Sequence, residues 1–221
     1  MFASCPKLPT LLIAGGLAAG VGILVFLGIE ISVGKTQAFD RAILLAMRRP
    51  DDHAPVGSAA FQQTARDISA LGSATVLWLL TGTIAGFLTL DGKKRLALFI
   101  CGCIATGLLL ETILKDIFDR PRPDIVPEAT YTRGASFPSG HAMMSAIVYL
   151  SLGASLARFH RRKAVKAYSI IVAVFLTILI GVTRVYLGVH WPTDVLAGWA
   201  VGGVWALLCQ LAANMVLLDR V

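Results

Sequence analysis

Residues Leu96–Pro123 read LALFICGCIATGLLLETILKDIFDRPRP, an apolar run that ends in a cluster of charged residues and prolines. A helix needs about 20 mostly apolar residues to cross the hydrocarbon core of a bilayer. The stretch Leu96–Leu114 meets that requirement, and the charges follow where a helix of this length leaves the membrane. The segment therefore predicts a membrane span with a polar site at its end.

The composition of the whole chain supports this interpretation. Of 221 residues, 56% are hydrophobic and 15% charged, with a mean hydropathy of +0.74. A soluble domain has about 25% charged residues, and its core could not hide so much apolar surface. Disorder and an ordinary water-soluble enzyme are excluded. The net charge of +7 indicates topology and not a nucleic-acid partner, because the basic residues lie between apolar spans.

Six stretches are long and apolar enough to cross a membrane. The sequence predicts an all-α, six-transmembrane-helix bundle, with residues 1–221 as a single integral-membrane domain. The first run is too long for the apolar part of a cleaved signal peptide, so we expect it to remain as a span. Glycines 198, 202 and 203 would let the last helix approach its neighbours closely. The spans are Leu11–Ile31, Ala70–Leu90, Leu96–Leu114, His141–Ala157, Ala167–Val185 and Val195–Leu217.

The connections between the spans predict an orientation. Two short, densely basic loops, Asp91–Arg95 and Arg158–Lys166, lie on the same side as both termini, which makes that side cytoplasmic. On the other side, Phe39, Ile43 and Met47 recur at helical spacing, which predicts a short amphipathic helix in the membrane interface or an ordered loop packed on the bundle. The polar face of that helix would carry the charged residues between them, Lys35, Asp40, Arg41 and Arg48. Residues 56–68 are a second candidate, so short interfacial helices are expected within 32–69.

Three polar clusters lie on the non-cytoplasmic side, and the first follows the third span. It contains Lys115 and Arg122, with Pro121 and Pro123 on either side of the arginine. Basic side chains at a membrane face often only extend to the lipid headgroups. Two prolines, however, keep the backbone extended, and an arginine held in this way suits bidentate recognition of a phosphate.

The second cluster is Phe137-Pro-Ser-Gly-His141 at the start of the fourth span. Ser139 is placed to be the N-cap of a helix, whose first N–H groups and positive dipole end bind phosphate well. Gly140 would let a ligand approach the backbone, and His141 lies in the first turn. A lone histidine there is more often structural, but its neighbours favour a functional role.

The third cluster, Thr183-Arg184 to Asp194, lies between the last two spans. An unpaired arginine such as Arg184 beside an apolar run needs an anion or a water-filled cavity. Pro192 is a candidate first helical residue, which places His190 just before the helix and Asp194 in its first turn. The carboxylate can then bond to one imidazole nitrogen and leave the other more basic.

Together the clusters supply three cations, two histidines and one carboxylate, which suit a tetrahedral phosphate anion. A zinc site is disfavoured because a third strong ligand is missing nearby and the cations would oppose a dication. One histidine can attack phosphorus while the other protonates the departing oxygen. The four cysteines, Cys5, Cys101, Cys103 and Cys209, are interpreted as plain small apolar residues.

The order and spacing of these motifs resemble the type 2 phosphatidic acid phosphatase family, whose pattern is Lys-x6-Arg-Pro, Pro-Ser-Gly-His and Ser-Arg-x5-His-x3-Asp. The chain departs from the pattern once, with a threonine at position 183 where the family usually has serine. A hydroxyl is retained, so we expect its phosphate contact to survive. The matching residues are Lys115…Arg122-Pro123, Pro138-Ser139-Gly140-His141 and Thr183-Arg184…His190…Asp194.

The resemblance implies a role for each matched residue. His190 would be the nucleophile that forms a phosphohistidine, with Asp194 as its orienting partner. His141 would protonate the leaving group and then activate water. The family works without a metal, so neither a metal nor another cofactor is expected, and Arg120 would be accessory because it lies outside the pattern. The phosphate cradle would consist of Lys115, Arg122, Ser139, the Gly140 N–H, Thr183 and Arg184.

The predicted function is that of a lipid phosphatase at the outer face of a bacterial-type inner membrane. Candidate substrates are undecaprenyl pyrophosphate, phosphatidylglycerol phosphate and phosphatidic acid. The loop 124–136, with Tyr131 and Arg133, is predicted to act as a lid or headgroup reader because it joins two clusters. Two alternatives stay open: a phosphotransferase between lipids, and a non-catalytic channel, transporter or lipid-binding protein that holds an anion.

Overall fold

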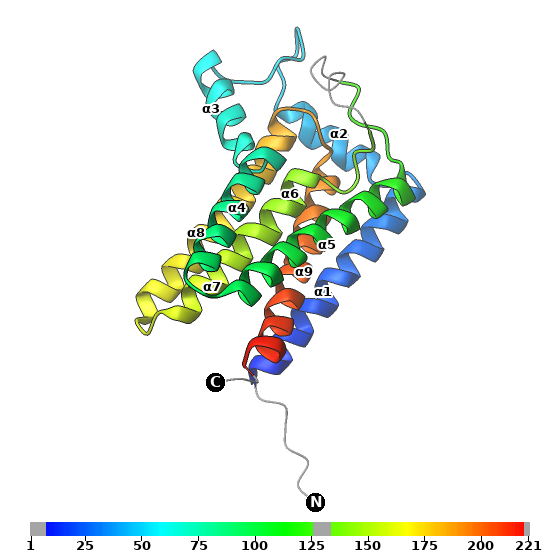
Figure 1. Cartoon of the computed structure of the whole chain (residues 1–221). Coiled ribbons are helices and arrows are strands. Elements are labelled where there is room, and N and C mark those ends of the chain that lie inside the picture. The colour runs from blue at the N-terminus through cyan, green and yellow to red at the C-terminus, as the bar shows by residue number, and fades with distance from the viewer. Residues whose placement is uncertain (1–7, 126–133, 219–221) are drawn as a thin grey trace, which may run out of the picture.

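The structure, a computed structural model, describes residues 8–125 and 134–218. Within these ranges the chain is built from helices joined by loops. Its helices pack side by side into an elongated bundle, with shorter helices at one end (Figure 1). The predicted all-α class is confirmed. The helices are α1 (Leu8–Ser32), α2 (Gln37–Ala46), α3 (Ala59–Ala70), α4 (Ala74–Leu90), α5 (Lys94–Phe118), α6 (Gly140–Ser145), the π-helical turn η2 (Ala146–Leu150), α7 (Ser151–Phe159), α8 (Lys163–Tyr186) and α9 (Pro192–Leu218).

Five of the helical segments are long and apolar enough to cross a membrane by themselves. The chain is thus an integral membrane protein, as its composition predicted. A sixth crossing is made if α3 and α4, which meet at an angle of 45°, count as one span. The five are Ile13–Ser32, Lys94–Phe118, Gly140–Arg158, Lys163–Tyr186 and Pro192–Ala213.

The predicted second span differs from the structure at its start. The sequence predicted one run from Ala70, but the chain turns there and α4 begins at Ala74. Ser73 causes the new start, because its hydroxyl accepts a hydrogen bond from the Val76 N–H at 3.3 Å and caps the helix.

Both basic loops lie at the same end of the bundle as the start of α1 and the end of α9 (Figure 1). The three polar clusters lie at the opposite end, where α5 and α8 finish and α6 and α9 begin. The common end predicted for the basic loops and the outer ends of the first and last helices is therefore what the structure shows.

The two short helices predicted between residues 32 and 69 are α2 and α3. Helix α2 packs on the polar end of the bundle, where Leu44 belongs to the same buried apolar cluster as Trp191 and Val195 at the start of α9. Ile43 and Met47 of the predicted apolar face pack against this cluster, whereas Phe39 is half exposed. Asp40, which was expected on the polar face, is fully buried. The prediction was wrong here because a carboxylate can be buried when the fold supplies partners for it.

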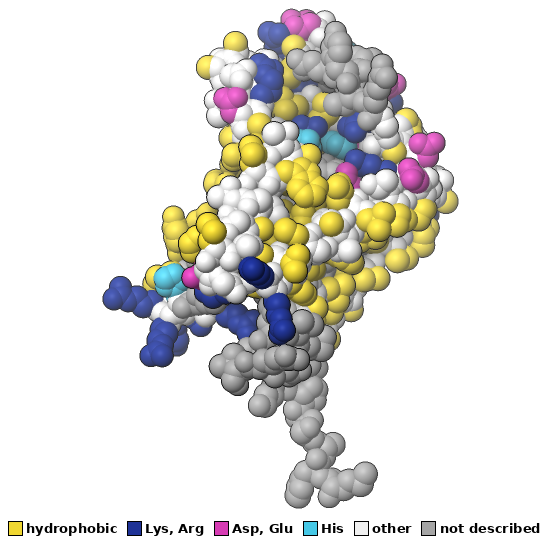
Figure 2. Space-filling view, in the orientation of Figure 1, with side chains coloured by type: hydrophobic (Ala, Val, Ile, Leu, Met, Phe, Trp, Pro, Cys, Tyr) yellow, Lys and Arg dark blue, Asp and Glu magenta, His cyan; other side chains and the backbone are white. Residues whose placement is uncertain are grey.

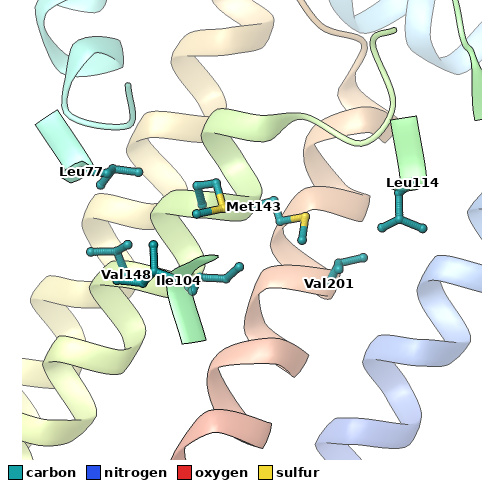
Figure 3. Packing of buried hydrophobic residues seen from close by; sticks show 8 residues of the cluster. Leu77, Ile104, Leu114, Met143, Val148 and Val201 are labelled. Carbon is teal, nitrogen blue, oxygen red and sulfur yellow. The ribbon is translucent and has the colours of Figure 1, made fainter. Parts of the chain in front are cut away.

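The centre of the bundle is an apolar cluster to which α4, α5, α6, η2 and α9 all contribute (Figure 3). Helices α6 and α9 come unusually close within it. A Cβ atom added to Gly198 would lie 2.8 Å from the Ser139 carbonyl oxygen, and one added to Gly202 would lie 2.4 Å from the Met143 carbonyl oxygen. Burial of these contacts holds the starts of both helices, and with them two of the polar clusters, against each other.

Adjacent glycines of α9 give a test of this packing. Gly202→Ala is expected to destabilise the protein by about 1–3 kcal/mol, because the new methyl group meets backbone atoms that cannot move aside. Gly203→Ala is the matched control, since a Cβ there would meet nothing within 4 Å. Thermal unfolding in detergent measures both, and equal melting temperatures for the two variants would contradict the close contact.

Candidate active site

The His190 imidazole is almost completely buried in the turn between α8 and α9. Its Nδ1 atom lies 2.9 Å from the Ser136 carbonyl oxygen and 3.6 Å from Asp194 Oδ2. A carbonyl and a carboxylate only accept hydrogen bonds, so they place the proton on Nδ1. The other nitrogen, Nε2, accepts from Arg122 Nη1 at 3.3 Å. The lone pair of Nε2 therefore faces the cations.

Asp194 lies in the first turn of α9, which begins at Pro192 as the sequence predicted. Its carboxylate is fully buried, and Oδ2 accepts a hydrogen bond from the Trp191 N–H at 2.9 Å. This bond caps the helix and fixes the carboxylate next to His190. Histidine and aspartate approach each other from either side of the helix start, as predicted.

A cavity of about 320 Å³ brings the cations and histidines of the three clusters together. Figure 2 shows basic and histidine side chains grouped in a hollow near the polar end of the molecule. The cavity continues between α4 and α5, where apolar side chains such as Leu77, Trp78, Ile104 and Leu108 line it. Its polar lining includes Lys115, Arg122, His141, Arg184 and His190.

Each cation in the cavity is held by a protein partner. Lys115 Nζ pairs with Glu111 at 2.6 Å, one helical turn earlier in α5. Arg122 Nη1 donates to the Val189 carbonyl at 2.9 Å, and Arg184 Nη1 donates to the Ser69 hydroxyl at 2.7 Å. These bonds fix the side chains before a ligand arrives, so an anion would meet preorganised donors.

The start of α6 forms another wall of the cavity. Ser139 is its N-cap residue, as predicted, but its buried hydroxyl caps nothing and has no hydrogen-bond partner within the described chain. Gly140 follows and lies so close to α5 that an added Cβ would be 2.2 Å from a Glu111 carboxylate oxygen. A side chain at position 140 would therefore displace the Glu111 carboxylate that pairs with Lys115, whereas glycine leaves this ion pair in place beside the cavity.

Burial makes His190 a weak base. It lowers the pKa of the imidazole to about 4, since removal from water penalises the charged form. Asp194 acts in the opposite direction, while Arg184 and Arg122 lower the pKa further. At neutral pH the imidazole is thus uncharged, which is the state that a nucleophile requires.

Residues 96–216, more than half of the chain, match the PAP2 superfamily. The chain belongs to this family. The resemblance inferred from the three motifs is confirmed, and all three lie inside the matched region.

Among curated members of the family, "Phosphatidylglycerophosphatase B" of Bacillus subtilis (strain 168) is 38% identical over 117 residues, which are 52% of this chain and 54% of that protein. "Undecaprenyl-diphosphatase" of Sulfolobus acidocaldarius is 43% identical over 114 residues, 49% of this chain and 51% of that protein. The chain therefore spans about half the length of these curated relatives.

A solved structure of the family covers more of the chain. It is the crystal structure of a transmembrane PAP2 type phosphatidylglycerolphosphate phosphatase from Bacillus subtilis, with a TM-score of 0.79 and 27% identity. The match covers 90% of this chain and 96% of that chain. The transmembrane bundle described above is thus the fold of this family.

Two predicted phosphate contacts lie outside the cavity wall. Thr183 is buried, and its hydroxyl donates to the Ile180 carbonyl of its own helix at 2.6 Å. Ser139 and Thr183 are absent from the residues that line the cavity. Their contacts with phosphate remain predictions, as do the roles of the other motif residues.

Sequence reasoning missed two carboxylates near the site. Glu111 was concealed in an apolar run, although its position four residues before Lys115 is the spacing of a helical ion pair. Asp40 was assigned to a polar face.

Of the predicted lid, residues 126–133, including Tyr131 and Arg133, lie outside the described residues. In the described ranges no group of three or more His, Cys, Asp or Glu side chains is placed to hold a metal ion.

Proposed function

We propose that this chain is a metal-independent lipid phosphatase that removes the terminal phosphate of a lipid phosphate or pyrophosphate through a phosphohistidine. The observation that carries the proposal is the single cavity in which two histidines and three cations meet. Holding a phosphate anion needs only the cations. A buried, neutral imidazole with its proton fixed on Nδ1 adds a nucleophile, which favours an enzyme over a transporter or binding protein.

In the first step, His190 Nε2 attacks phosphorus and the bond from phosphorus to the leaving oxygen breaks. His141 donates its proton to that oxygen, so the alcohol or phosphate departs with that oxygen protonated. Lys115, Arg122 and Arg184, with the Gly140 N–H, stabilise the charge on the other phosphate oxygens.

In the second step, His141 takes a proton from water while the water oxygen attacks phosphorus. The phosphorus–nitrogen bond breaks, inorganic phosphate leaves and His190 is restored with its electron pair. Asp194 stabilises the positive charge that develops on the His190 imidazole during both steps, because its carboxylate lies beside Nδ1. No cofactor is needed to balance either step.

The apolar part of the cavity supports a lipid substrate. A hydrocarbon chain can lie against Leu77 and Leu108 between α4 and α5 while its phosphate reaches the cations. The names of the relatives favour phosphatidylglycerol phosphate and undecaprenyl pyrophosphate, with phosphatidic acid as the third candidate. No nucleic-acid partner is proposed.

We further infer a location in a bacterial inner membrane, with 1–221 as one membrane domain. The basic loops and both termini would face the cytoplasm, since short loops rich in Lys and Arg stay on that side. The active site would then face the periplasm or cell exterior, because it lies at the opposite end of the bundle.

The proposal is tested by measuring inorganic phosphate released from short-chain forms of the three candidate lipids in the presence of EDTA. We expect release from at least one lipid at an undiminished rate, because the protein's own cations take the place of a metal. Transfer of labelled phosphate to an added lipid alcohol, with little release of inorganic phosphate, would instead indicate the phosphotransferase. Loss of all activity in EDTA would contradict the mechanism.

A further inference from the structure

The Arg120 guanidinium lies between two buried carboxylates that belong to different helices. Its Nη1 atom pairs with Asp194 Oδ1 at 2.5 Å, and its Nη2 atom pairs with Asp40 Oδ2 at 2.6 Å. The hydroxyl of Thr36 also accepts from Nη2, at 3.2 Å. Arginine suits this bridge because its planar fork presents separate donors in fixed directions.

Asp40 bonds to the start of α9 as well as to Arg120. Its carboxylate accepts from the Thr193 N–H at 3.0 Å and from the Thr193 hydroxyl. Through Asp40, helix α2 thus holds both the Thr193 backbone next to Asp194 and the Arg120 side chain that pairs with Asp194. Both carboxylates are 0% exposed, so any displacement would leave a charge unpaired in the protein interior.

The cluster contains more negative than positive charge, and the excess lies next to His190. Two carboxylates share one guanidinium, so Arg120 does not fully neutralise Asp194. A negative charge therefore remains beside the imidazole, where phosphorylation on Nε2 creates positive charge. If Asp40 were uncharged, Arg120 would neutralise Asp194 alone and this stabilisation would weaken.

The backbone of Arg120 reaches His190 by a second route. Its carbonyl accepts a hydrogen bond from the Ser136 N–H at 2.8 Å. The Ser136 carbonyl in turn lies 2.9 Å from His190 Nδ1. One residue thus supports both acceptors of the imidazole proton, Asp194 through its side chain and Ser136 through its backbone.

We propose that Asp40 is a positioning residue for the reaction: it holds Arg120 between the two carboxylates and so keeps Asp194 directed at His190. This inference rests on the proposed phosphatase function. It also gives Arg120 a defined task, although both residues lie outside the family motifs. Neither residue lines the cavity, so neither is required to touch the substrate.

The decisive variant is Asp40→Asn, which retains the shape of the side chain and removes its charge. We expect kcat to fall about 10- to 100-fold, because small displacements of reacting groups cost rates of this order. KM is expected to stay within about threefold of the wild-type value, since the hydrogen bonds and ion pairs of Asp40 do not involve the cavity cations. Asp52→Asn, in an exposed ion pair with Arg49, is the matched control and should leave kcat unchanged.

A double-mutant cycle separates positioning from a general loss of structure. If Asp40 acts through Asp194, adding Asp40→Asn to Asp194→Asn is expected to lower kcat by less than about threefold. Equal losses in both backgrounds, a rise in KM alone, or an unchanged kcat in the single variant would each overturn the proposal. Should Asp40→Asn fail to fold by circular dichroism, Thr36→Val is the second variant. It removes only the Thr36 hydroxyl, which is the other acceptor at Arg120 Nη2, and leaves Asp40 in place. It is then expected to lower kcat about 3- to 10-fold, and an unchanged kcat would overturn the proposal.

The wild-type protein distinguishes the two levels of inference. If it releases no phosphate from any lipid, the proposed function itself fails and this inference falls with it. If the wild type is active and the variants of Asp40 and Thr36 are equally active, the phosphatase function stands and only the positioning role is overturned.

Discussion

His190→Ala is expected to lower phosphate release from a lipid phosphate by at least about 10⁴-fold, because no other group replaces a lost nucleophile. Lys115, Arg122 and Arg184 remain in place, so substrate binding is expected to persist. The measurement is release of inorganic phosphate under saturating substrate. Binding of a slowly hydrolysed lipid phosphonate, followed by calorimetry in detergent, checks that the cavity is intact.

The same position allows a chemical rescue. In His190→Gly, added imidazole is expected to accept the phosphoryl group and restore part of the leaving-group release, since the missing side chain leaves space beside Arg122. His160→Ala is the control because His160 is exposed and lies at the opposite end of the bundle, at the end of α7. Wild-type activity in His190→Ala would end the phosphohistidine mechanism.

The second large effect is expected for His141→Asn and depends on the leaving group. With a lipid phosphate, whose alkoxide leaves poorly without a proton, activity is expected to fall about 10²- to 10⁴-fold. With p-nitrophenyl phosphate the leaving group needs no proton, so His190 should still be phosphorylated at nearly the normal rate. Hydrolysis of the phosphohistidine remains slow because the base that activates water is absent.

Rapid-mixing kinetics of His141→Asn with p-nitrophenyl phosphate therefore give a clear signature. We expect a burst of about one p-nitrophenolate per active site, followed by slow turnover. The wild-type protein, which has both functions of His141, is the reference for the burst rate. Equal losses on both substrates without a burst would mean that His141 contributes to phosphate binding and not to proton transfer.

Local sequence patterns predicted much of the architecture for a simple reason. A bilayer requires long apolar runs whatever their neighbours are, so spans can be recognised one at a time. The start of α9 was also predictable, since Pro192 lacks an N–H group that the first turn would leave unbonded. At Ser73 a helix-capping residue interrupts the apolar run, so the observed start of α4 lies a few residues after the predicted start of the span.

The polar network around the site depends on contacts between distant segments. Asp40 was predicted on a polar face from the spacing of its neighbours, yet it is buried because Arg120, 80 residues later, supplies the counter-charge. His190 Nδ1 lies beside the backbone carbonyl of Ser136. Every residue has such a carbonyl, so no sequence motif could indicate this contact. Thr183 shows the opposite case, in which a hydroxyl that matches a motif bonds to its own helix.

The sequence by itself determined the membrane class, most of the spans and the residues that we propose bind a phosphate, because apolar length and side-chain chemistry are properties of short segments. Only the tertiary structure decided how those residues are held: Glu111 against Lys115, and Asp40 through Arg120 to Asp194. The physical reason is that a buried charge is stable only beside its partner, and partners far apart in the chain are chosen by packing.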